Sequence, residues 1–343
     1  MRMKLVLKIL GLVIGIPAIA LTAFFLWGSA STTDRKTYDD IVEYDAPSPA
    51  VKNSYTIVSY NIGYLSGLAN NTTTKPEPSM FTENFQRAIA ALADVTPDII
   101  AFQEIDFNAK RSYGQNQMQQ IAEALEMNSG AIAVNWDKNY QPIPYWPPSA
   151  HFGKILTGQA VLSHYPIEKN NRIVLERIAD KSFIYNAFYL DRLAQVSQIS
   201  LDGQPVIVIN VHLEAFVEST RLSQTQFVRS LVEDYAQTLP VIVIGDFNSA
   251  VNRPSFATPD GQTYEERQFS IKELLNSEQL APAVPAADWS NTLNATFPSN
   301  APEYKLDYIF YTPSTLEMVS AKVLTDAGES SDHLPLMMEF RFK

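Results

Sequence analysis

The feature that most limits how this chain can fold is a set of apolar stretches that each end in polar side chains. The clearest are residues 205–212 (PVIVINVH) and 240–246 (PVIVIGD). Continuous apolar runs of this length are typical of strands covered on both faces. Because such strands are buried along their length, their polar ends are the places where side chains from several strands can converge.

The remaining pattern predicts a layered α/β sandwich rather than a doubly wound sheet, since helices alternate with strands early and strands follow strands late. Helical spacing of apolar residues runs through 85–92, 118–125 and 228–235. The chain shows no internal repeat of fixed period. Further strands are predicted at residues 55–60, 98–102, 131–134, 159–163, 305–311, 318–324 and 334–340.

Residues 139–153 (NYQPIPYWPPSAHFG) interrupt this pattern with four prolines and several aromatic residues, and are predicted to form a loop. One interpretation is a stiff surface connection whose rings pack on the core. The other is a rim around a substrate site, or a lip that touches a membrane. The sequence does not separate the two.

Residues 9–27 run for 19 positions without a charge and would span roughly 28 Å as a helix, close to the thickness of a bilayer's hydrocarbon core. They are predicted to be one N-terminal transmembrane helix. Arg2, Lys4 and Lys8 precede it, which places the N-terminus in the cytoplasm and the rest of the chain outside. The alternative is a signal peptide cleaved near Gly28-Ser29-Ala30, which would release a secreted protein, but an uncleaved anchor is favoured.

This interpretation divides the chain into four parts. Residues 1–8 are a cytoplasmic basic segment, residues 9–27 the anchor or signal, residues 28–53 a tether with little periodicity, and residues 54–343 the functional domain. We expect the protein to be a single-pass membrane protein whose domain lies outside the cytoplasmic membrane.

Composition excludes several kinds of chemistry. The chain has no cysteine, which rules out thiolate nucleophiles, disulfides and cysteine-ligated metals. Without Arg2, Lys4 and Lys8 the rest of the chain carries 23 basic and 37 acidic residues, a formal charge of −14. This balance argues against nucleic acid as the partner but does not exclude it. Asn70, Asn71 and Asn294 stand in glycosylation-type triplets, which often arise by chance.

Seven polar residues stand at strand ends, and their recurrence is the functional signal. Taken singly, Glu104 could cap a helix, Asn61 could serve a turn and His212 could be a satisfied core histidine. Taken together, the acids form an all-oxygen set that suits Mg²⁺ or Mn²⁺ better than zinc. The seven are Asn61, Glu104, His212, Asp246, Asn248, Asp332 and His333.

These residues lie in motifs that resemble those of the endonuclease/exonuclease/phosphatase superfamily, which includes DNase I-like nucleases, inositol polyphosphate 5-phosphatases and sphingomyelinases. The motifs are YNIG at 60–63, QEID at 103–106, NVHLE at 210–214, GDFN at 245–248 and SDHLP at 331–335, in the family's order. The stretch LDYI at 306–309 adds to them, and the resemblance covers roughly residues 54–343.

The resemblance implies a four-layered α/β sandwich (DNase I-like) that cleaves phosphoester bonds with Mg²⁺, Mn²⁺ being the other candidate. By position, Glu104 would be the principal metal ligand, helped by Asn61 and Asp332. Asp246 would position or activate the attacking water and Asn248 would hold a phosphate oxygen or the water. His212 and His333 would bind the phosphoryl group and transfer protons, with Asp307 orienting His333. His164 stands where the family often has arginine and is assigned no role.

The sequence therefore predicts a phosphodiesterase that attacks a lipid head group or another small phosphoester with metal-assisted water. The first alternative is an exported nuclease of the same fold, which the acidic charge disfavours. The second is a membrane-tethered binding module without turnover, which the completeness of the motifs disfavours. A phosphomonoester substrate also stays open, and the oligomeric state is unknown.

Overall fold

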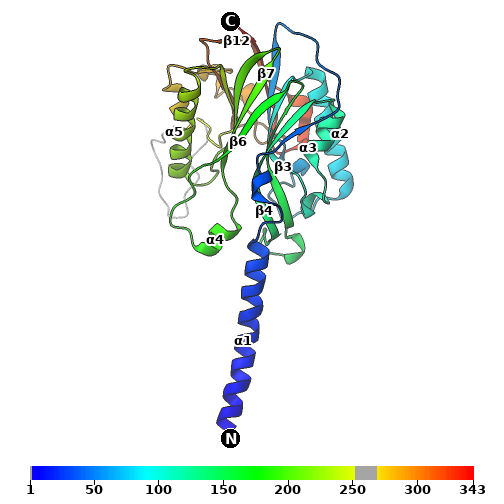
Figure 1. Ribbon diagram of the computed structural model, residues 1–343, viewed down its shortest axis with the longest axis vertical. Coiled ribbons are helices and arrows are strands. Elements are labelled where there is room, and N and C mark those ends of the chain that lie inside the picture. The colour runs from blue at the N-terminus through cyan, green and yellow to red at the C-terminus, as the bar shows by residue number, and fades with distance from the viewer. Residues whose placement is uncertain (1, 252–268) are drawn as a thin grey trace.

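Two β-sheets packed face to face form the centre of the molecule, with helices on both outer faces (Figure 1). The computed structural model describes residues 2–251 and 269–343, with the backbone alone for residues 2–7, 9, 10 and 12. Within these residues the first sheet has seven strands and the second has six. The predicted layered α/β sandwich is thereby confirmed.

The seven-stranded sheet follows the order β1-β4-β5-β3-β2-β13-β12. Its strands are β1 (Ile41–Glu43), β2 (Tyr55–Asn61), β3 (Ile99–Asp106), β4 (Ser129–Gln141), β5 (Gly153–Ser163), β12 (Leu316–Val323) and β13 (Leu336–Phe342). The six-stranded sheet follows the order β10-β11-β9-β8-β7-β6. Its strands are β6 (Ile167–Val174), β7 (Leu193–Leu201), β8 (Gln204–His212), β9 (Val241–Asp246), β10 (Ala281–Pro282) and β11 (Asp307–Tyr311).

The helices lie outside these sheets. In Figure 1, α2 (Pro78–Val95) and α3 (Gln117–Ala124) lie on the side of the seven-stranded sheet and α5 (Glu218–Tyr235) lies on the opposite side. α4 (Phe183–Phe188) and α6 (Lys272–Leu275) are short. Single 3₁₀ turns complete the list: Arg35–Thr37, Gly63–Leu65, Lys110–Ser112, Pro148–Ala150, Ala286–Asp288, Thr292–Asn294 and Thr325–Ser330.

Alternation along the strands divides most of the apolar side chains between two large cores. On β2, Ile57 faces the six-stranded sheet and joins the core between the sheets, while Val58 and Tyr60 join the core under α2 and α3. All three are fully buried. The continuous apolar runs of β8 and β9 arise because α5 covers the outer face of the sheet that they form, contributing Val228 and Val232 to the same core.

The long hairpin of β4 and β5 differs from the prediction. The strand predicted at 131–134 runs from Ser129 to Gln141, so the predicted loop 139–153 is shortened at both ends. Its tip carries Tyr145 and Trp146, which are 75% and 77% exposed, so these two rings do not pack on the core. The C-terminal part of β4 was predicted as loop because its residues are mostly polar.

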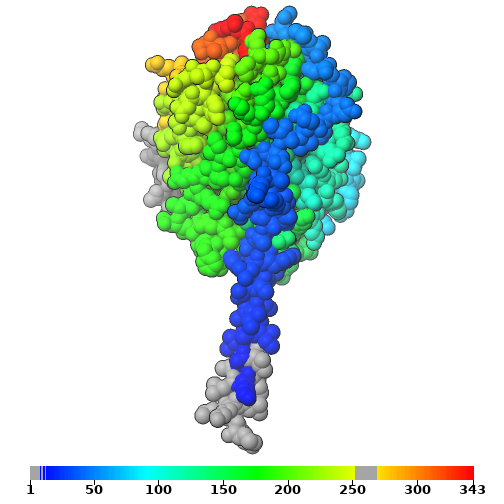
Figure 2. Space-filling view, in the orientation of Figure 1, coloured from blue at the N-terminus to red at the C-terminus, as the bar shows by residue number. Residues whose placement is uncertain are grey.

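The segment 28–53 is more ordered than a tether. β1 pairs with β4 at the edge of the seven-stranded sheet. Asp137 on β4 accepts hydrogen bonds from Thr32 N at 2.7 Å, Thr33 N at 3.0 Å and Tyr38 OH at 2.8 Å. Figure 2 shows this segment lying along the surface of the globular part. A three-residue edge strand is too short to produce a recognisable alternation, which is why the sequence did not reveal it.

The N-terminal helix α1 (Arg2–Ser29) projects away from the sheets, with Pro17 inside it (Figure 1). In the part of the chain that the structure describes, no helix has both the length and the apolar character needed to cross a bilayer. The transmembrane prediction for residues 9–27 is therefore not supported. Met1 and the side chains of Arg2 and Lys4, which belong to the predicted basic segment, lie outside the described residues.

Candidate active site

The polar side chains at the ends of the strands come together because neighbouring strands run in the same direction. β2 runs parallel to β3, and β8 runs parallel to β9, so each pair ends at the same edge of its sheet. His212 is the register partner of Asp246 across β8 and β9, and Asp307 is the partner of Asp246 across β9 and β11. The close approach needs Gly245, where an added Cβ would lie 2.0 Å from the Val211 carbonyl oxygen.

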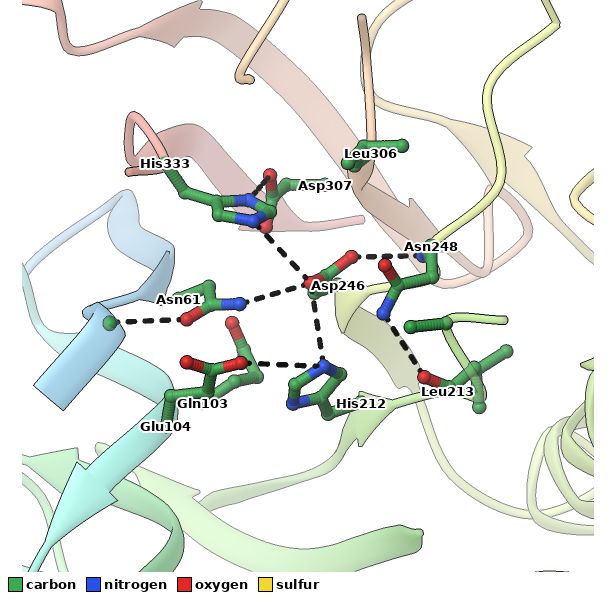
Figure 3. Close-up of polar contacts among 12 residues, drawn as sticks. Asn61, Gln103, Glu104, His212, Leu213, Asp246, Asn248, Leu306, Asp307 and His333 are labelled. Carbon is green, nitrogen blue, oxygen red and sulfur yellow. Dashed lines mark hydrogen bonds and ion pairs between the residues drawn. The ribbon is translucent and has the colours of Figure 1, made fainter. Parts of the chain in front are cut away.

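Asp246 lies at the centre of the site (Figure 3). Its Oδ2 accepts a hydrogen bond from Asn61 Nδ2 at 3.0 Å, and its Oδ1 accepts one from the Asn248 backbone N–H at 2.9 Å. The same Oδ2 lies 3.5 Å from His212 Nε2 and 3.7 Å from His333 Nε2. Burial raises the pKa of Asp246 to about 6, although the His333 cation opposes the rise. A carboxylate with such a pKa is suited to accept a proton near neutral pH.

His333 is held by Asp307. Its Nδ1 lies 2.9 Å from Asp307 Oδ2, and because an ionised carboxylate only accepts, Nδ1 is the donor. This leaves Nε2 directed towards Asp246. Burial alone would lower the pKa of His333, but the charges of Asp307 and Asp246 outweigh it and raise the pKa to about 10. His333 is therefore a cation at neutral pH.

His212 has the opposite charge state. Burial first, and then the cations Arg192 and His333, hold the pKa of His212 well below its usual value. Its Nε2 lies 3.9 Å from Glu104 Oε1, while its buried Nδ1 has no hydrogen-bond partner in the described residues. The site thus presents one charged and one neutral imidazole to the same carboxylate, Asp246.

Glu104 and Asp332 lie on the other side of the site, joined by Asn70. The Asn70 Nδ2 donates to Glu104 Oε2 at 2.9 Å and to Asp332 Oδ1 at 3.1 Å. Burial raises the pKa of Glu104 to about 7, and the negative charge of Asp332 adds to the rise. Glu104 has a φ of +52° and stands at a β-bulge of β3, which turns its side chain out of the strand alternation.

The structure brings together all of the site residues that the sequence predicted. Asn61 contacts Asp246 rather than either of the two acids with which it was grouped as a metal ligand. Asn248 donates from Nδ2 to the Leu213 carbonyl at 3.1 Å. The sequence did not identify Asn70 as a site residue, because it lies in a loop without periodicity and meets Asp332 across 262 positions.

Two oxygen-rich groups fit a hard divalent cation. One is the pair of Glu104 and Asp332, two acids that share a single amide and carry excess negative charge. The other is Asp246, Asp307 and His333, whose possible ligand atoms lie within 4.8 Å of one another, where His333 would have to lose a proton before it could bind a metal. The roles of individual residues as ligands stay predictions.

Comparisons with known proteins agree with this geometry. The sequence model of the Endonuclease/Exonuclease/phosphatase family matches residues 58–333. The catalytic domain of human Nocturnin with bound sulfate anion is similar in structure, at 18% identity over 91% of this chain and 100% of that chain, with a TM-score of 0.57. A mannosyl-6-phosphatase of Bacteroides thetaiotaomicron matches at 17% identity over 84% of this chain and 100% of that chain, with a TM-score of 0.56.

A UPF0294 protein of Vibrio cholerae is similar in sequence, at 31% identity over 140 residues. The match spans 41% of this chain and 41% of the length of that relative. The structural similarities, all below 20% identity, indicate a shared fold, and the family match covers each predicted site residue from Asn61 to His333.

Proposed function

The chain belongs to the endonuclease/exonuclease/phosphatase family, whose members are generally phosphoester hydrolases, and from this premise we propose that it is a Mg²⁺-dependent phosphodiesterase. The observation that carries the proposal is the convergence of a charged His333 and a neutral His212 on Asp246. A phosphodiester needs its charged oxygens neutralised and a water aligned for attack, and these three side chains meet both needs.

Each side chain has a distinct part. His333, fixed by Asp307, donates from Nε2 to an oxygen of the phosphoryl group. Asp246, oriented by Asn61 and the Asn248 backbone, accepts the proton of the attacking water as the new P–O bond forms. The P–O bond to the leaving group breaks at the same time, and the leaving oxygen takes its proton from His333 Nε2. Glu104 and Asp332 would hold Mg²⁺ or Mn²⁺, which supplies further neutralisation of the phosphoryl oxygens when bound.

The experiment is metal-dependent hydrolysis by the purified full chain. We expect it to cleave bis(p-nitrophenyl) phosphate with Mg²⁺, to stop when EDTA is added and to recover with excess Mg²⁺ or Mn²⁺. Asp246→Asn keeps the size of the side chain and removes the proton acceptor, so it should lose activity. Metal-independent hydrolysis, or full activity of Asp246→Asn, would contradict the proposal. Hydrolysis of no phosphoester would favour the binding module.

We propose a lipid head group or another small phosphoester as the substrate. The chain's formal net charge of −11 favours this class over nucleic acid. Incubation with sphingomyelin, inositol phosphates, RNA and plasmid tests it, and faster plasmid nicking than lipid cleavage would favour the nuclease.

The similarity to a mannosyl-6-phosphatase makes a phosphomonoester the second candidate substrate. Hydrolysis of p-nitrophenyl phosphate tests this candidate.

We also propose that the domain lies outside the cytoplasmic membrane, with the N-terminus inside. The support is the uncharged sequence of residues 9–27 behind Arg2, Lys4 and Lys8. Protease added to intact spheroplasts should digest the domain, which should stay attached to the membrane fraction. Protection from protease would contradict this location, and release into the medium would indicate cleavage of the N-terminal segment.

A further inference from the structure

A pocket lies beside the end of α1, and none of its lining residues belongs to the active site. Its volume is about 240 Å³, below the ~300 Å³ lower end for drug-sized ligands, so it suits a head-group-sized ligand. One wall is the segment that directly follows α1, including Arg35 and Asp39. The rest of the lining comes from β4, β6 and the chain around them, including Lys138 and Arg172.

The lining is cationic in an acidic chain. Four cationic side chains and three carboxylates give it a net charge of +1, against −11 for the whole chain. The four cations are Arg35, Lys138, Arg172 and Arg177.

Two of the three carboxylates are already satisfied by protein donors. Asp137 accepts from Thr32, Thr33 and Tyr38, and Asp191 accepts from Arg172 Nη2 at 2.6 Å and from Arg177 Nε at 3.0 Å. Asp191 is thus paired with two arginines, and both oxygens of Asp137 are occupied by neutral donors. These two carboxylates compete little with an anionic ligand for the remaining cationic groups.

Arg35 and Lys138 keep their charge available. Among the described residues, neither forms an ion pair within 4.0 Å. Lys138 Nζ donates to the Ser29 carbonyl at 3.0 Å, which leaves two of its protons unused. Burial, followed by the charge of Arg35, lowers the pKa of Lys138, although the charges of Asp191 and Asp137 oppose this.

Apolar surface lies immediately beside this charge. On α1, Ile19, Leu21 and Leu26 are 72%, 69% and 63% exposed. At its C-terminal end the rings of Phe24 and Trp27 pack against Tyr140 on β4, with centroids 5.4 and 6.2 Å apart. Eight residues after Trp27, the chain reaches Arg35 in the pocket. The exposed apolar side chains of α1 would match the acyl chains of a lipid, the aromatic rings its interfacial region and the basic pocket its phosphate.

We propose that this pocket binds the phosphate group of an anionic lipid whose acyl chains lie along α1. Arg35 and Lys138 contact the phosphate, and Arg172 and Arg177 add to the positive potential. The inference rests on lipid contact by α1 and not on the proposed hydrolysis, since binding here needs neither the active-site residues nor a metal.

The test measures binding of dihexanoyl phosphatidic acid, below its micelle concentration, to the full chain in non-ionic detergent with EDTA present. We expect saturable binding with a Kd at least tenfold below that of inorganic phosphate, because only the lipid gains contacts with α1. Arg35→Gln should raise this Kd about fivefold, the effect of one basic residue near a lipid surface.

Two variants make the result specific. Lys36→Gln removes the same charge from the exposed neighbour of Arg35 that does not line the pocket, and should leave the Kd unchanged. Asp39→Asn removes a negative charge from the lining and should lower the Kd about threefold, a gain that local misfolding would not produce. Equal effects of Arg35→Gln and Lys36→Gln would overturn the proposal, as would inorganic phosphate binding as tightly as the lipid. Because EDTA prevents metal-dependent turnover, failure here is separable from failure of the proposed hydrolysis.

Discussion

The two sides of the active site balance their charges differently. On one side, which we name the imidazole half (Asp246, Asp307 and His333), both acids face the His333 cation at 2.9 and 3.7 Å. On the other, which we name the carboxylate pair (Glu104 and Asp332), two acids share the neutral amide of Asn70. The imidazole half contains a cation of its own, while the carboxylate pair has only a neutral amide between its two acids.

The difference indicates a division of labour. The hydrogen bond between His333 and Asp307 orients the imidazole half before substrate arrives, which the proposed proton transfer requires. Burial first, and then the charge of Asp332, raises the pKa of Glu104, as expected for two acids brought close together in a buried site. Each prediction below changes a residue in one part of the active site and names the kinetic quantity that should change.

Removing an imidazole should have the largest effect. His333→Ala and His212→Ala should each lower kcat by ~10²–10⁴-fold, as expected for positioned acid/base groups, with the domain still folded by circular dichroism. His164→Ala is the matched control, since His164 is half-buried and outside the site. If His164→Ala lowers kcat as much as the other two, the histidines act through stability rather than chemistry.

Weakening the carboxylate pair should have an intermediate effect on a different quantity. Asn70→Ala removes the amide that bridges Glu104 and Asp332, so the Mg²⁺ concentration for half-maximal activity should rise ~10–100-fold, as for other partners that orient metal ligands. At saturating Mg²⁺ the activity should largely recover. Thr73→Ala, at an exposed position of the same loop, is the control. An unchanged Mg²⁺ dependence would place the metal in the imidazole half.

Changing the partner of His333 should have the smallest effect at neutral pH. The raised pKa means that the His333 cation persists until the pH passes about 10. Asp307→Asn removes the larger of the two raising charges, so the alkaline limb of the pH–rate profile should move to lower pH. We expect a loss below ~10-fold at pH 7 that grows as the pH rises. An unmoved alkaline limb would mean that another group sets it.

Much of the fold was predictable because burial leaves a clear pattern. The strands β8 and β9 are apolar throughout, and the helices α2, α3 and α5 carry one apolar stripe each, so their existence followed directly. β6 and β7 were not predicted, because β6 (IEKNNRIV) carries polar residues at most positions of an exposed edge. The predicted ends of several strands and helices differ from the observed ends by a few residues, because pairing partners rather than composition decide where such an element ends.

The site was predictable wherever a polar residue ends an apolar strand. His212 and Asp246 met this condition, and the structure places them 3.5 Å apart. Asn70 did not meet it, since its position depends on a loop that only the tertiary structure defines. The separate charge states of His212 and His333 also needed coordinates, because they arise from burial and Arg192 at His212 and from Asp307 and Asp246 at His333.

The pairing of β1 with β4 and the hydrogen bonds at Asp137 have a consequence for how the catalytic domain can move. They fasten the chain directly after α1 to the sheet, leaving no slack between helix and domain. The active site is therefore held at a set distance from the C-terminal end of α1, and a change in the orientation of that helix would turn the whole domain with it.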